Sequence, residues 1–171
     1  MSSQPRITAI EARLAGAPFH VLRDADGSLC AAGFGPVGVS LAKLSGALAG
    51  ARPAADPAPG DVLAALAALD AGDAEPLLAF PVRQPGTEFR QAVWAELRRV
   101  APGAPLSYAA LAARVGRPRA VRAVASACAN NLVAVFVPCH RIVRSDGSLG
   151  GYLYGLPAKE RLLALERGAG E

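Results

Sequence analysis

A cysteine followed directly by a histidine is the residue pair of this sequence with the clearest chemical potential. Cys139 and His140 stand in the segment FVPCHRIV, just after an apolar run at 131–137 that is rich in β-branched residues. Such a run predicts a buried strand, and Pro138 predicts its end because proline cannot donate a ladder hydrogen bond. The two side chains are therefore expected where the chain leaves the core.

A thiol attacks as its thiolate, and an ordinary cysteine is mostly protonated at neutral pH. His140 could remove the proton, and Arg141 and Arg144 would add positive potential that favours the thiolate. Neighbours in an extended strand face opposite sides, so contact between Cys139 and His140 requires a sharp bend or a bridging water. The alternative, in which Cys139 is a small core residue and His140 its polar neighbour, stays open at this point.

Other residues with ligand chemistry are scarce. The chain has three cysteines (Cys30, Cys128 and Cys139) without CxxC spacing, and two histidines (His20 and His140). This pattern indicates neither a disulfide framework nor a zinc site, so we expect no metal and no cofactor.

Charge is distributed unevenly along the 171 residues. Residues 1–80 hold five basic and eight acidic side chains, whereas residues 81–171 hold thirteen basic and six acidic ones. The asymmetry indicates an acidic partner for the second half, with nucleic acid as the first candidate and a merely solvated basic face as the alternative.

No apolar stretch is long enough to span a membrane, and the first sixteen residues lack the apolar segment of a signal peptide. We therefore expect a cytoplasmic protein that does not bind membranes.

Residues 1–80 predict a small α/β scaffold domain. Two apolar segments around a DADG turn indicate a β-hairpin over 19–34, and a weakly helical stretch follows at 39–49. Asp61 is predicted to cap the helix VLAALAAL, and LLAFPV at 77–82 predicts a short strand.

Residues 81–171 predict a mostly helical domain. The expected helices are EFRQAVWAELRRV capped by Thr87, YAALAARV capped by Ser107, AVRAVASACAN after the turn GRPR, and LPAKERLLALERG near the end. The middle two, around a tight Gly/Pro turn, are typical of a helix-turn-helix, although other helical hairpins share this form.

The second helix of that pair carries small side chains from Ala120 to Ala129, with basic residues at its beginning. Small side chains let a helix approach a DNA groove closely, and a tightly packed core is the structural alternative. The residues expected to contact DNA are Arg117, Arg119, Arg122, Ala123, Ser126 and Ala127.

The run PCHRIV, with Asn131 eight residues before the cysteine, resembles the active-site signature of the O6-alkylguanine-DNA alkyltransferases, or methylated-DNA–protein-cysteine methyltransferases. The resemblance extends from about Pro81 to Gly168 and includes SYAALAARV, RAVRAVASACANN and GGYLYG in the expected order. It implies a ribonuclease-H-like N-terminal α/β domain and a winged-helix-like C-terminal domain. It also implies repair of duplex DNA by transfer of the alkyl group to the protein, once per molecule.

The resemblance assigns roles to individual residues. Cys139 would accept the alkyl group, and His140 would deprotonate it through a bound water. Glu166 would orient His140, and Asn131 would brace the turn before the active-site segment. Tyr108 would help rotate the nucleotide out of the duplex and donate a hydrogen bond to guanine N3.

Arg122 would fill the gap that the flipped nucleotide leaves in the base stack. Tyr152 would lie against the flipped base, in a substrate pocket that we expect to include Leu153 and Val143. Relatives often carry a polar residue at the position of Leu153, so the preferred alkyl group stays open. Activity on O4-alkylthymine and cooperative assembly on DNA stay open as well, and we expect a monomer in solution.

Two other functions deserve comparison with alkyl transfer. A non-catalytic, alkyltransferase-like lesion-binding protein usually replaces the cysteine by tryptophan, whereas this chain retains Cys139. A cysteine hydrolase using Cys139 and His140 would need an oxyanion loop, which is not recognisable in the sequence.

Overall fold

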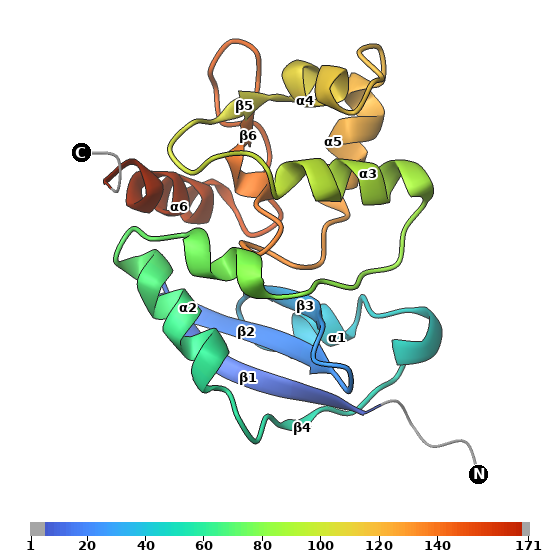
Figure 1. The fold of residues 1–171 in the computed structure, drawn as a ribbon, viewed down its shortest axis with the longest axis vertical. Helices are drawn as coiled ribbons and strands as arrows, with labels where there is room; N and C mark the ends of the chain where they lie inside the picture. The colour runs from blue at the N-terminus through green and yellow to red at the C-terminus, as the bar shows by residue number, and fades with distance from the viewer. Residues whose placement is uncertain (1–5, 169–171) are drawn as a thin grey trace.

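The N-terminal part of the chain forms a four-stranded sheet (Figure 1). The structure is a computed structural model and describes residues 6–168. Strands β1 (Ile7–Leu14), β2 (Ala17–Asp24) and β3 (Leu29–Phe34) pair antiparallel in sequence order. The short β4 (Ala54–Ala55) runs parallel to β1. The predicted hairpin is confirmed as β2 and β3.

Strand β1 was not predicted. Its fully buried residues Ile7, Ile10 and Leu14 are spaced three and four apart rather than two, so the usual alternation of a strand is hidden. The irregular burial arises because β1 is covered on both faces: Ile10 and Leu14 belong to the main core, whereas Ile7 packs with Leu22 and Ala31 in a second cluster.

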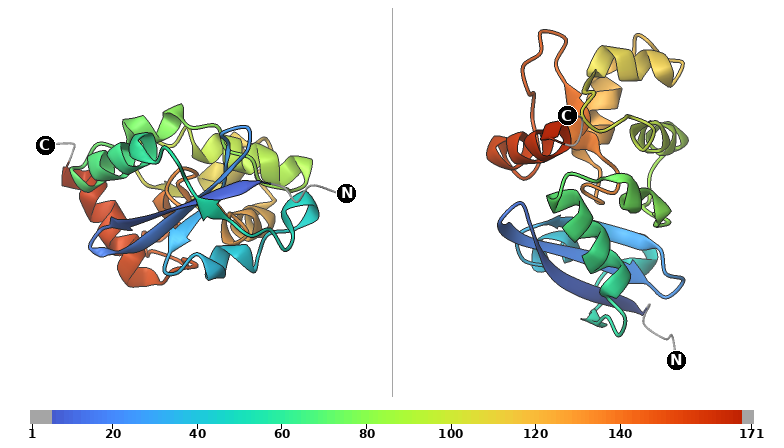
Figure 2. Two further views of the ribbon diagram at one scale, coloured as in Figure 1. Left: turned by 90° about the horizontal axis from the view of Figure 1, so that it is seen from below. Right: turned by 60° about the vertical axis from the view of Figure 1, so that its left-hand side comes forward.

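Helices α1 (Gly38–Leu41) and α2 (Gly60–Asp70) and two 3-10 turns, Gly46–Leu48 and Glu75–Ala79, complete this part. The prediction of one helix over 39–49 was wrong, because α1 ends at Leu41 and the extended backbone of Ser45 separates it from the 3-10 turn at Gly46–Leu48. Helix α2 packs its apolar side across one face of the sheet (Figure 2).

Asp61 does not occupy the predicted cap position. The residue before α2 is Pro59, and Asp61 lies in the first turn, where its carboxylate pairs with Arg23 at 2.7 Å. The predicted strand at 77–82 is also wrong, because this segment forms a 3-10 turn and joins the sheet only through a bridge between Leu29 and Val82.

The C-terminal part contains α3 (Glu88–Leu97), α4 (Tyr108–Arg114), α5 (Val121–Ala129) and α6 (Leu156–Gly168). A small parallel pair, β5 (Leu106–Ser107) and β6 (Ile142–Val143), lies between them. Both predicted caps are confirmed, since Thr87 accepts a hydrogen bond from Arg90 N and Ser107 accepts one from Ala110 N.

The segment 131–137 is not the predicted strand. Within the described chain it pairs with the sheet only at one bridge, from Ala32 to Val133, and Val135 adopts a left-handed φ of 64°. The Phe136 and Val137 amides donate to carbonyls of the same segment, which therefore forms a buried turn. Cys139–Arg141 then form a 3-10 turn.

One hydrophobic core continues from the sheet into the helical part, joining residues such as Phe19 and Leu66 to Val93 and Leu111. The chain is thus a mixed α/β protein, as the sequence predicted, and the division at residue 80 stays a prediction. Among residues 6–168, no helix has the length and apolar character needed to cross a bilayer.

Candidate active site

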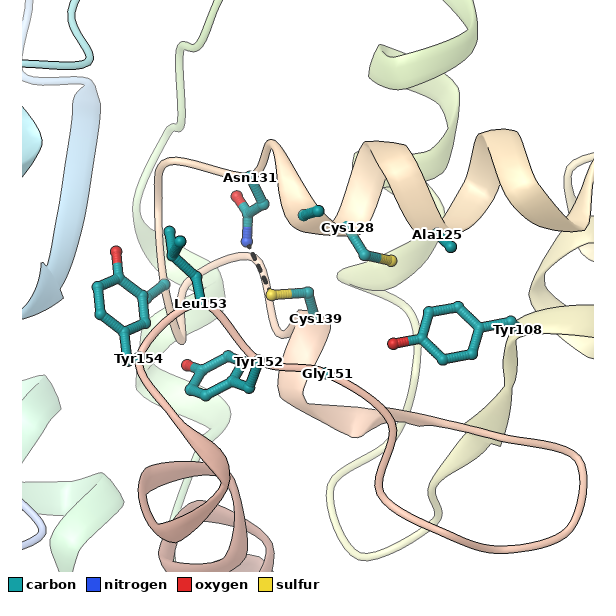
Figure 3. Close-up of a pocket in the computed structure, with 11 residues that line it drawn as sticks. Tyr108, Ala125, Cys128, Asn131, Cys139, Gly151, Tyr152, Leu153 and Tyr154 are labelled. Atoms are coloured by element: carbon teal, nitrogen blue, oxygen red, sulfur yellow. Dashed lines mark hydrogen bonds between the residues drawn. The ribbon is translucent and has the colours of Figure 1, made fainter.

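Cys139 opens onto a cavity of about 310 Å³ between the end of α5, the start of α4 and the loop before α6 (Figure 3). The cavity is lined by Tyr108, Ala125, Cys128, Ala129, Asn131, Ala134, Cys139, Gly151, Tyr152, Leu153 and Tyr154. The fold therefore brings together five residues that the sequence singled out: Cys139, Asn131, Tyr108, Tyr152 and Leu153.

Asn131 is fixed by four hydrogen bonds. Its Nδ2 donates to Val137 O at 2.8 Å and to Cys139 Sγ at 3.4 Å. Its Oδ1 accepts from Val133 N at 3.1 Å and from Gln84 Nε2 at 2.9 Å. The amide thus braces the buried turn and supplies a donor to the sulfur.

Gln84, which sequence reasoning missed, completes this arrangement. The side chain is buried, and its Oε1 accepts from Leu132 N at 2.8 Å while its Nε2 donates to Asn131. A glutamine in a loop gives no sequence signal of such a role, because its partners lie 47 and 48 residues away.

Burial raises the pKa of the Cys139 thiol, while the Asn131 hydrogen bond and the charge of Lys159 pull that pKa back down. The thiol is therefore protonated at neutral pH. Rapid attack by this sulfur requires a base that takes the proton.

His140, which follows Cys139 directly in the chain, forms a buried pair with Glu166. His140 Nε2 lies 2.8 Å from Glu166 Oε1, and both side chains are almost entirely inaccessible. Burial alone would raise the pKa of Glu166, but hydrogen bonds from His140 and Arg141 outweigh it and lower this pKa to about 2. Burial lowers the pKa of His140, so the imidazole is neutral near pH 7.

This arrangement fixes the tautomer of His140. The Glu166 carboxylate can only accept, so Nε2 carries the proton and donates it, which leaves a lone pair on Nδ1. In the described part of the chain, this buried Nδ1 has no hydrogen-bond partner. A lone pair without a partner is suited to accept a proton.

The predicted contribution of Arg141 to the thiolate was wrong. Its guanidinium is buried and committed to Glu166, with Nη2 2.8 Å from Oε1 and Nε 3.0 Å from Oε2, and it also donates to Val100 O. The nearby cation whose charge lowers the Cys139 pKa is Lys159 instead.

Lys159 is fully buried in α6, and its Nζ donates to the carbonyls of Ile142, Leu149 and Gly151. It thereby ties the loop that carries Tyr152 to the segment after Cys139. One sequence signal was available, since Lys159 is the only lysine among the basic residues of the second half.

Tyr108, at the start of α4, and Tyr152, in the loop before α6, both line the cavity. Burial raises the pKa of both phenols. Within residues 6–168, the buried Tyr152 hydroxyl has no hydrogen-bond partner. Tyr154, another lining residue, was not predicted.

The candidate DNA-contacting residues are mostly exposed at the start of α5 and in the preceding turn. Arg119, Arg122, Ala123 and Ser126 are exposed, as is Arg117, whose guanidinium lies 5.9 Å from the Phe89 ring centroid.

Two predicted placements need correction. Ala127 is fully buried and faces Trp94, whose Nε1 donates to its carbonyl at 2.9 Å, because α5 turns this side toward the core. Val143 does not line the Cys139 cavity; its position in β6 places it beside Gly103 and Leu163 at a separate cavity.

Residues 88–168 match the family model described as the 6-O-methylguanine DNA methyltransferase, DNA binding domain. The chain is 46% identical over 120 residues to a bifunctional transcriptional activator/DNA repair enzyme Ada from Escherichia coli, covering 67% of this chain and 33% of that protein. It is 42% identical over 96 residues to a methylated-DNA–protein-cysteine methyltransferase from Haemophilus influenzae, covering 56% of this chain and 54% of the relative. The chain thus spans about a third to a half of these curated relatives.

The fold is similar to that of Mycobacterium tuberculosis OGT in a crystal structure with DNA, with a TM-score of 0.76 and 29% identity. That similarity covers 96% of this chain and 94% of the other. On these matches and the PCHR segment at Cys139, residues 88–168 of the chain are similar to the DNA-binding domain of the methylated-DNA–protein-cysteine methyltransferases.

Proposed function

We propose that this chain repairs DNA by direct reversal, transferring the alkyl group of O6-alkylguanine to Cys139. One observation carries the proposal: a thiol held by Asn131 opens into a cavity, next in sequence to the buried His140–Glu166 pair. The names of the relatives and the DNA in the OGT structure support the same substrate class.

The chemistry assigns each proton a destination. The thiol proton passes through a water to His140 Nδ1, and the sulfur attacks the alkyl carbon. The new bond joins Sγ to that carbon, and the bond from the carbon to guanine O6 breaks. The Tyr108 hydroxyl donates its proton to guanine N3, so that the base leaves neutral, and the proton held by His140 then returns through water to the Tyr108 oxygen. No oxyanion hole is needed because the attacked carbon is saturated.

The lesion lies inside the duplex, so the nucleotide must be extruded before reaction. In our proposal α4 and α5 act as a helix-turn-helix in the minor groove, within a winged-helix-like second half that follows a ribonuclease-H-like first half. Arg122 inserts into the base stack, while Arg117 and Arg119 contact phosphates. The exposed Ala123 and Ser126 allow a close approach of α5.

The reaction occurs once per molecule. Water or a second thiol does not displace a thioether under cellular conditions. Cys128 also lines the cavity, yet its thiol could not regenerate Cys139 for the same reason. The protein is therefore consumed by the repair, and we propose that it acts as a monomer without a cofactor.

Intact-mass measurement after mixing with a duplex that contains O6-methylguanine tests the proposal. We expect one added methyl group per protein, located on Cys139 by peptide mapping, and no product beyond one equivalent. The Cys139→Ala variant is the matched control and must stay unmodified. Binding without transfer would instead indicate a lesion-recognition protein, and continued turnover would refute the single-use mechanism.

A further inference from the structure

Tyr154 belongs to the wall of the Cys139 cavity but is held by the N-terminal sheet. Its hydroxyl donates to Ala32 O at 3.2 Å, and its ring packs edge-on against Phe34 with centroids 5.8 Å apart. Figure 3 shows Tyr154 beyond Leu153, at the end of the cavity away from Tyr108. One side chain therefore connects strand β3 to the reaction cavity.

The glycine at position 33 makes this contact possible. A Cβ added there would lie 2.3 Å from Tyr154 Oη and 2.7 Å from its Cζ, closer than real atoms approach. Gly33 pairs with His20 inside the sheet, and its φ lies outside the left-handed region. A strand glycine that the backbone does not require weakens the strand and marks a close approach of another group.

Strand β3 supports a second wall of the same cavity. The carbonyl of Ala32, which accepts from Tyr154, also accepts from Ala134 N at 3.0 Å. Ala134 lines the cavity from the buried turn that leads to Cys139. The sheet thus holds two cavity walls through one carbonyl.

We propose that Gly33 is a positioning residue that sets, through Tyr154, the largest alkyl group the cavity admits. The inference rests on the proposed alkyl transfer and extends it by making the N-terminal sheet a determinant of substrate size. A side chain at position 33 blocks the place of the phenol against β3. The ring must then move away from the sheet, toward the cavity that it lines, and reduce the space for bulky groups.

The test compares transfer rates for O6-benzylguanine and O6-methylguanine placed in the same duplex, so that DNA binding cancels in the ratio. Gly33→Ala should lower the benzyl-to-methyl ratio on the order of tenfold, as steric discrimination in an apolar pocket does. Tyr154→Ala should raise that ratio. In the double variant, Gly33→Ala should have no further effect, because the ring through which it acts is gone.

Gly38→Ala is the matched control, since a Cβ there would meet no described atom within 4 Å. An unchanged ratio in folded Gly33→Ala, or an effect that persists without the Tyr154 ring, would overturn the inference. If Gly33→Ala does not fold, Tyr154→Ala decides, and an unchanged ratio in that variant overturns it equally. Failure of the wild-type protein to accept a methyl group would instead refute the proposed function itself.

Discussion

The Asn131 side-chain nitrogen lies 2.8 Å from the carbonyl oxygen of Val137 and 3.4 Å from the sulfur of Cys139. A single amide group therefore holds both the turn that precedes the nucleophile and the nucleophile itself. Because the hydrogen bond is stronger to a thiolate than to a thiol, it lowers the Cys139 pKa against the effect of burial.

Replacement of Asn131 by alanine should shift the reactivity of Cys139 to higher pH. Loss of the donor leaves burial less opposed, so the thiol pKa rises and less thiolate is present at any given pH. The rate of iodoacetamide modification of the Cys139 peptide, followed by mass spectrometry from pH 6 to about 10, measures the shift. Asn130→Ala is the control, since the Asn130 amide donates to Ser126 instead. An unmoved profile would contradict the role.

Cys139→Ala should abolish alkyl transfer and leave DNA binding intact, because the thiol serves chemistry and makes none of the proposed DNA contacts. Cys128→Ala should retain transfer, although Cys128 lines the same cavity. Burial raises the pKa of Cys128 strongly, so its thiol is a poor nucleophile. Labelled oligonucleotides measure transfer, and band shifts measure binding. Loss of transfer in Cys128→Ala would show that the nucleophile is wrongly assigned.

Arg122→Ala should slow repair of duplex DNA far more than reaction with free O6-benzylguanine. Extrusion of a nucleotide costs a few kcal/mol, and the free base does not need it. The loss on duplex DNA should be on the order of tenfold or more, measured under single-turnover conditions. Arg167→Ala, another exposed arginine, is the control. Equal losses on both substrates would rule out the proposed insertion into the base stack.

Glu166 should make the protein sensitive to acid. Its pKa is about 2 in the folded chain against an ordinary value of 4.5, so its ionised form stabilises the fold at neutral pH. That stabilisation, on the order of 3 kcal/mol, is present above pH 4.5 and is lost as the pH falls toward 2. Urea denaturation should show a smaller loss between these pH values for Glu166→Gln than for the exposed control Glu160→Gln. Equal losses would contradict the assignment.

Lys159→Met should destabilise the fold and reduce reactivity together. Three carbonyls lose their buried donor, which costs on the order of 3 kcal/mol, and the Cys139 thiolate loses a nearby positive charge. Denaturation measures the first effect, and the pH profile of thiol alkylation measures the second, as a shift to higher pH. The control is Lys43→Met at the other lysine of the chain, which is exposed; it should change neither the stability nor the pH profile of thiol alkylation.

The sequence by itself determined the helices of the second half and the resemblance of that half to the alkyltransferases. Thr87 and Ser107 cap their helices because a side-chain oxygen bonds the third amide onward, a local interaction that residue type reveals. The PCHR segment, the Asn131 position eight residues before its cysteine and the basic turn before α5 are likewise local patterns that the sequence alone reveals.

Only the tertiary structure decided how the site is held. The segment 131–137 has strand-like composition, yet the side chains of Gln84 and Asn131 accept from its first amides, at Leu132 and Val133. The left-handed backbone of Val135 then turns the segment back. Arg141 forms an ion pair with Glu166, 25 residues away, and the Tyr154 hydroxyl donates a hydrogen bond to the carbonyl of Ala32, 122 residues away. These partners meet through packing of distant segments, so residue type and local periodicity carry no signal of them. The substrate-size limit that we infer at Gly33 likewise depends on a contact between distant segments, which only the tertiary structure shows.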